Sequence, residues 1–349
     1  MKKLHTVLLT LGFAFLIFLV WRTGLPQLWR QLTLLGWGLI PIVIAEGVGE
    51  LFHAISWRYC LSGPHRRLSL LRLARIHFAG YAISFLTPTA SIAGEVTKGV
   101  LLAGRRQEGP EAVSAVIIGK LSTALAHLSL IAVGSIVLLP VLQLPSALRT
   151  ALILSSAALA AGIVIFLLLQ KYGKLGVLMR WLVARNILAK TLRRVLPSIE
   201  QVDETLKTFY RERPWDFAQS VFWHWLGFAA GIFSTWYVLF LLAEESAFIV
   251  AARVWCLVLW FDLVTFAVPF SLGVLEGGRA VAFHAFGFSA LPGLAFGIVT
   301  RLAQLVWATF GLVNYALMVA HIAPHARPHR FGSLLPPREA EAPRSVPAR

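Results

Sequence analysis

Two acidic residues, Glu95 and Glu276, stand in apolar parts of the chain, and basic residues follow each of them at the same spacing. A shift of 181 residues, the separation of these two glutamates, superimposes two copies of the pattern Pro-x6-Glu-x2-(Lys/Arg)-x21-(Lys/Arg). The first copy contains Pro88, Glu95, Lys98 and Lys120, and the second contains Pro269, Glu276, Arg279 and Arg301. A carboxylate can bind a cationic group, and Lys or Arg can bind phosphate. Because charges are costly inside an apolar segment, their repetition predicts a binding site or an internal repeat of ion pairs.

Each copy also contains a helix break. Proline ends an apolar run, and small or hydroxyl residues surround it: Thr87, Ser91 and Gly94 in the first copy, Ser271 and Gly273 in the second. Half-helix ends present unpaired backbone groups and a dipole to a ligand. We therefore predict that both breaks contribute to one polar site near the middle of the membrane, where Glu95 and Glu276 approach each other. The alternative is that the charges form buried ion pairs that hold the broken helices, and the two roles are compatible.

Other polar residues also lie within apolar segments. Glu46, Glu50 and His53 are spaced i, i+4 and i+7 and so share one helix face, and Arg253 and Asp262 lie in the second half. One interpretation is a proton relay, because histidine titrates near neutral pH. The favoured interpretation is structural pairing of the acidic stripe with Arg72, Arg75 or Arg253.

Composition indicates the class of protein. The 349 residues are 58% hydrophobic and 14% charged, with a mean hydropathy of +0.74, which predicts an all-α, polytopic integral membrane protein. The net charge of +16 is typical of basic cytoplasmic loops beside anionic lipid, so we do not expect nucleic-acid binding. The two cysteines form no metal motif and no GxxxxGK[ST] sequence occurs, so we expect no metal, cofactor or bound ATP.

The order of apolar runs predicts two repeats within a transmembrane domain spanning 1–323. Repeat one covers about 37–139 and repeat two about 216–321, while a basic linker at 171–213, which includes an amphipathic helix, and a disordered tail at 324–349 are cytoplasmic. Each repeat contains a span and then a broken run with a short helix, predicted to form a re-entrant hairpin. A basic loop after the first span corresponds to the acidic loop AEES in the second half, which predicts repeats inverted in a cell (inner) membrane, with both termini cytoplasmic.

The two motifs, TPTASIAGEVTKGVLL and VPFSLGVLEGG, resemble the transmembrane, flippase-like domain of lysylphosphatidylglycerol synthases and its stand-alone relatives, including membrane proteins associated with hopanoid synthesis. The resemblance covers roughly residues 4–321. The family markers match at Pro88, Gly94 and Glu95, and at Pro269, Gly273 and Glu276, whereas Ala93 stands where a second glycine is common.

This resemblance implies transfer of a polar-headgroup lipid between membrane leaflets, without the synthase half that makes aminoacyl lipid. The expected partners are membrane lipids and lipid-biosynthesis enzymes, and homo-oligomerisation is left open. We expect a transporter, not an enzyme. The alternatives are a membrane enzyme or accessory subunit acting on lipid-linked substrates, with Glu95 or Glu276 as general base and His127 assisting, and a scaffold for lipid synthesis.

Overall fold

The computed structural model describes residues 25–87, 92–103, 109–138, 146–172, 175–185, 207–265 and 273–322. All regular secondary structure in these ranges is helical, which confirms the all-α class. Several predicted features lie outside the described residues: the helix breaks at Pro88, Ser91, Pro269 and Ser271, most of the linker, and the tail.

The described helices repeat in order and length. The first half contains α2 (Leu25–Leu35), α3 (Leu39–Cys60), α4 (Leu70–Leu86), α5 (Ile92–Ala103) and α6 (Gly109–Leu138). Helices α7 (Ser146–Lys171) and α8 (Leu175–Ala184) come next along the chain, and the second half contains α10 (Pro214–Ala243), α11 (Phe248–Thr265), α12 (Val274–Ala285) and α13 (Ala290–Ile322). The shift of 181 residues therefore places α3 to α6 over α10 to α13.

Local sequence explains where α4 begins and ends. Ser69 caps its start by accepting a hydrogen bond from the Arg72 backbone N–H, as hydroxyl residues commonly do. The helix ends at Thr87, whose backbone is extended, because a residue that precedes proline is disfavoured in the helical region. The predicted break of the apolar run therefore coincides with an observed helix end.

Four described helical stretches are long and apolar enough to cross a membrane: Leu32–Cys60, Glu111–Leu138, Pro214–Ala243 and Ala290–Ala320. This confirms the prediction of a polytopic membrane protein. The corresponding helices α5 and α12 have only 12 residues each, or about 18 Å at 1.5 Å per residue, which is shorter than the hydrocarbon core of about 30 Å.

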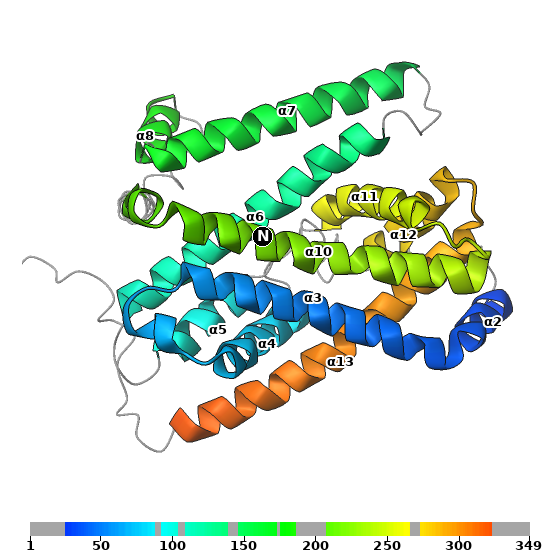
Figure 1. Cartoon of the computed structure of the whole chain (residues 1–349), viewed down its shortest axis with the longest axis horizontal. Helices are drawn as coiled ribbons and strands as arrows, with labels where there is room; N and C mark the ends of the chain where they lie inside the picture. Colours follow the sequence, from blue (N-terminus) through cyan, green and yellow to red (C-terminus); the bar gives the residue numbers. More distant parts are fainter. Residues whose placement is uncertain are drawn as a thin grey trace, which may run out of the picture.

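Corresponding helices of the two halves run in opposite directions. Helices α3 and α10 lie side by side and antiparallel (Figure 1): Ser56 contacts Ser220, His53 contacts His224, and Gly49 approaches Gly227. Each step toward the start of α3 is therefore a step toward the end of α10. Close approach at the central glycines is typical of membrane helix interfaces, where small residues allow backbones to meet.

The remaining contacts are exchanged between the halves. Helix α4 packs on α13, and its counterpart α11 packs on α6, the counterpart of α13. Arg75 of α4 donates a hydrogen bond to Asn314 of α13, and Cys256 of α11 lies against Gly134 of α6. The two halves are thus related by an approximate twofold rotation, and its axis is perpendicular to the antiparallel α3 and α10.

Replacing Gly311 with alanine is expected to lower the melting temperature in detergent strongly. A Cβ atom there would lie 2.1 Å from the Phe78 backbone oxygen of α4, so α4 and α13 must separate, at a cost of about 3 kcal/mol. Gly162→Ala is the control, because a Cβ there meets nothing within 4 Å and alanine favours a helix. Tryptophan fluorescence during heating measures both changes, and equal melting temperatures for the two variants would contradict this packing.

Candidate functional site

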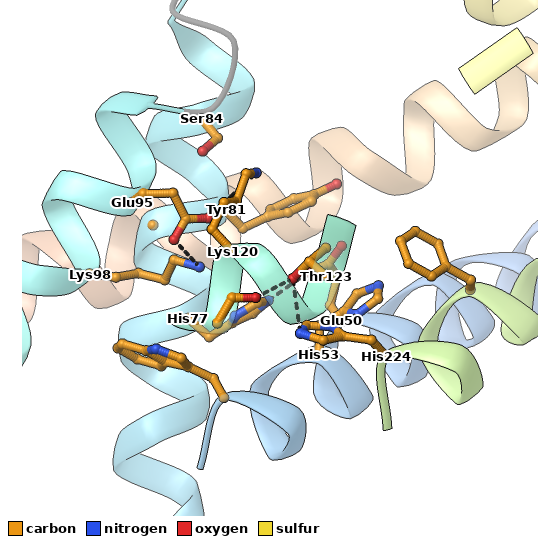
Figure 2. A pocket seen from close by; sticks show the side chains of 14 residues that line it. Glu50, His53, His77, Tyr81, Ser84, Glu95, Lys98, Lys120, Thr123 and His224 are labelled. Atoms are coloured by element: carbon orange, nitrogen blue, oxygen red, sulfur yellow. Dashed lines mark hydrogen bonds and ion pairs between the residues drawn. The ribbon is translucent and has the colours of Figure 1, made fainter. Parts of the chain in front are cut away.

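A polar cavity of about 210 Å³ lies between helices of both halves. Figure 2 shows side chains from α3, α4, α5, α6 and α10 around it, although these helices are far apart in the sequence. The lining residues are Glu50, His53, Trp57, His77, Gly80, Tyr81, Ser84, Glu95, Lys98, Gly119, Lys120, Thr123, His224 and Phe228. Three of the predicted site residues, Glu95, Lys98 and Lys120, therefore come together here.

Glu95 lies between two lysines. Its Oε2 is 2.8 Å from Nζ of Lys98, and its Oε1 is 3.8 Å from Nζ of Lys120. The Lys98 side chain is only 12% exposed and its ammonium lies over the Trp57 ring, whereas the Lys120 side chain is 43% exposed. Lys98 is therefore the fixed counter-charge of Glu95, and Lys120 is the cation that the cavity presents to a ligand.

Helix α5 positions this cluster because it packs closely against α4. Glu95 is in the first turn of α5, and Lys98 follows one turn later on the same face. A Cβ atom at Gly94 would lie 1.9 Å from Oγ of Ser84 and 2.2 Å from the Gly80 backbone oxygen. The structure thus shows that Gly94, predicted to contact substrate, allows α4 and α5 to meet at the cavity wall.

A second polar group consists of histidines. Nε2 of His77 is 2.7 Å from Oε2 of Glu50, so the partner of Glu50 is a histidine and not one of the arginines suggested by the sequence. Nδ1 of His53 is 2.7 Å from Nδ1 of His224, whose Nε2 is 2.9 Å from the Thr123 hydroxyl. A hydrogen bond between two Nδ1 atoms requires one ring to donate and the other to accept, so this pair holds a proton between two helices.

The second-half glutamate has a different environment. Glu276 is almost fully buried: its Oε1 is 3.2 Å from Nη2 of Arg301, and its Oε2 accepts a hydrogen bond of 2.9 Å from the Gly273 backbone N–H. Gly273 has φ of 74°, which favours glycine, and caps α12. Arg279 pairs with Asp262 at 3.7 Å. Of the two cations predicted for Glu276, the structure places Arg301 beside it.

The other predicted residues divide between these environments. Glu50 and His53 line the cavity, while Glu46 interacts electrostatically with the buried Arg279 and Asp262. The Thr87 hydroxyl donates to the Ile83 carbonyl of its own helix. Arg253 lies on α11, where its Nε is buried without a hydrogen-bond partner among the described residues. A substrate role for Glu276, Arg279, Arg301 and Gly273 stays a prediction.

Sequence reasoning gave His77, His224 and Thr123 no place in a site. The available signal for His77 and His224 was a titratable residue inside an apolar helix, which usually faces protein or water in a membrane protein. Among the described residues, no group of three or more His, Cys, Asp or Glu side chains is placed to hold a metal ion.

Long apolar helices that enclose a charged cavity define an integral membrane protein with an internal polar site. The family model described as the lysylphosphatidylglycerol synthase TM region matches residues 6–311, and the chain therefore belongs to this family. Membership links it to the handling of membrane lipids. The curated proteins and the solved structures gave no significant match.

Proposed function

We propose that this protein moves a polar-headgroup lipid between the leaflets of its membrane, with the headgroup in the cavity and the acyl chains in the bilayer. The observation that carries this proposal is the Lys98, Glu95 and Lys120 cluster in an open cavity within an apolar bundle. A charged group at the bilayer centre costs at least about 3 kcal/mol without polar partners. Charged and hydrogen-bonding groups along the path lower this barrier.

The charges favour a headgroup that contains phosphate. Two lysines and one glutamate give the cluster a net positive charge, and the more exposed ammonium, that of Lys120, can bind a phosphate oxygen. Glu95 can accept hydrogen bonds from hydroxyl or amine groups of the same headgroup. Tyr81 and Ser84 line the same space and can supply further hydrogen bonds.

The twofold relation supports access from both sides of the membrane. If α3 and α10 span the bilayer, an axis perpendicular to them lies in the membrane plane, so one half is inverted relative to the other. In this arrangement α5 and α12 belong to re-entrant hairpins from opposite faces, and the basic loop after α3 is cytoplasmic together with both termini. Inverted repeats allow one site to open alternately to each side.

Cysteines introduced at Arg67 and Glu244 are expected to react with an impermeant thiol reagent from opposite sides of the membrane. These residues lie in the loops that follow the corresponding helices α3 and α10. Labelling of sealed right-side-out and inside-out vesicles measures this, with the native Cys60 and Cys256 as background. Labelling of both positions from the same side would contradict the inversion.

Reconstitution of purified protein into liposomes tests the proposed activity. We expect the protein to make a fluorescent phospholipid in the inner leaflet accessible to an external quencher without added nucleotide. Lys120→Gln should slow this movement about tenfold by removing a charge-assisted hydrogen bond to phosphate. Mass spectrometry of the recovered lipid is the control for chemistry: a modified lipid without movement would support the membrane-enzyme alternative and contradict transport.

A further inference from the structure

A second cavity, of about 340 Å³, lies outside the proposed transport site. Its lining combines two arginines with an apolar wall: Ser69, Leu71, Arg72, Arg75, Ile76, Leu101, Leu317 and Met318. We define these residues as the α4–α13 groove, because most come from the start of α4 and the end of α13. None of them lines the polar cavity.

The two sites use different faces of α4. Arg72, Arg75 and Ile76 are spaced i, i+3 and i+4 and therefore share one face. His77, Tyr81 and Ser84, which line the polar cavity, are spaced i, i+4 and i+7 on another face. A ligand in the groove would therefore be separated from the transported headgroup by the helix itself.

The groove presents oriented cationic groups. Nε of Arg75 donates a 2.7 Å hydrogen bond to Oδ1 of Asn314, which fixes the guanidinium between α4 and α13. A guanidinium has five N–H donors, so the outer Nη edge remains oriented toward the groove for a bidentate contact with phosphate. Arg72 is exposed one turn earlier, and Ser69 marks the positive end of the α4 dipole.

The apolar wall matches the other part of a phospholipid. Ile76 and Leu101 are buried, and Leu317 and Met318 lie on the long span of α13 close to its end. Basic residues at this end of the bundle, including Arg66 and Arg67 in the preceding loop, are expected at the cytoplasmic surface, where anionic lipid accumulates. A phosphate at interfacial depth with an acyl chain along α13 satisfies both parts of the groove.

We propose that the α4–α13 groove is a binding site for one anionic phospholipid, held by its phosphate at Arg72 and Arg75 with an acyl chain against Ile76, Leu101 and Met318. Charge complementarity selects this occupant, because a zwitterionic lipid brings a cation beside the two arginines. The site is independent of transport through the polar cavity. It fixes a lipid where α4, α5 and α13 meet.

Native mass spectrometry of the delipidated full chain, titrated with phosphatidylglycerol or phosphatidylcholine, tests this site. We expect one phosphatidylglycerol to bind at least about tenfold more tightly than phosphatidylcholine, and Arg72→Gln/Arg75→Gln to remove this preference. Arg66→Gln/Arg67→Gln makes the same change of charge outside the groove and should leave the preference intact. Lys120→Gln, in the polar cavity, should also retain the bound phosphatidylglycerol.

Met318→Trp is a second test that leaves the charge unchanged. The larger side chain should fill the apolar wall and weaken phosphatidylglycerol binding about tenfold, and it decides the matter if the double arginine variant fails to fold. Equal affinity for the two lipids, or an equal loss of affinity in Arg66→Gln/Arg67→Gln, would overturn the proposal.

Discussion

Replacing Glu95 with alanine is expected to abolish lipid movement and to lower the free energy of unfolding by about 3–5 kcal/mol. The reason is the side chain of Lys98, only 12% exposed, whose ammonium would lose a carboxylate 2.8 Å away. Unfolding in mixed micelles measures the stability, and the liposome assay measures lipid movement. Movement at the wild-type rate would contradict the role of Glu95 in the cavity.

The double variant Glu95→Gln/Lys98→Gln separates the structural role of this pair from its transport role. It removes both charges and leaves no uncompensated ion, so most of the lost stability should return. Lipid movement should stay absent, because the cavity has lost the carboxylate that contacts the headgroup. If movement returns together with stability, the pair is only structural.

Replacing Glu276 with alanine is expected to have a comparably large effect on stability, about 3–5 kcal/mol, by leaving Arg301 without its carboxylate inside the bundle. The variant also loses the side chain that accepts the Gly273 N–H at the start of α12. Thermal unfolding of purified protein measures the loss. A stability change below about 1 kcal/mol would contradict the buried pair seen in the structure.

The double variant Glu276→Gln/Arg301→Gln tests the role of the second glutamate in transport. We expect stability to recover and lipid to move within a few-fold of the wild-type rate, because Glu276 does not line the polar cavity. A stable double variant that moves no lipid would instead support the substrate role predicted from the repeated motif. The comparison with Glu95→Gln/Lys98→Gln is matched, since each variant removes one ion pair from one half.

The sequence was sufficient for the parts of the structure that depend on local pattern. Apolar runs predicted the helices, and the repeated spacing around Glu95 and Glu276 predicted that the helices recur in the same order. The proline after Thr87 predicted the end of α4. These features follow from short-range constraints on backbone and hydropathy.

The missed parts of the site depend on packing between distant helices. His77 meets Glu50 across 27 residues, and His53 meets His224 across 171, so neither contact has a local signature. Arg279 and Arg301 occupy matching positions with the two lysines, but burial and neighbouring groups give Arg279 to Asp262. The repeat thus conserves helix order, while the partners of its charges differ between the halves.

Photo-crosslinking in reconstituted membranes tests most directly whether a lipid headgroup enters the polar cavity. A phospholipid with a photoreactive headgroup should label α5 and α6 around Glu95 and Lys120, whereas the same lipid with a photoreactive acyl chain should label exposed apolar residues such as Ile136 and Leu154. Mass spectrometry of peptides locates both adducts. Headgroup adducts confined to the exposed apolar surface, with none around Glu95 and Lys120, would contradict transport through this cavity.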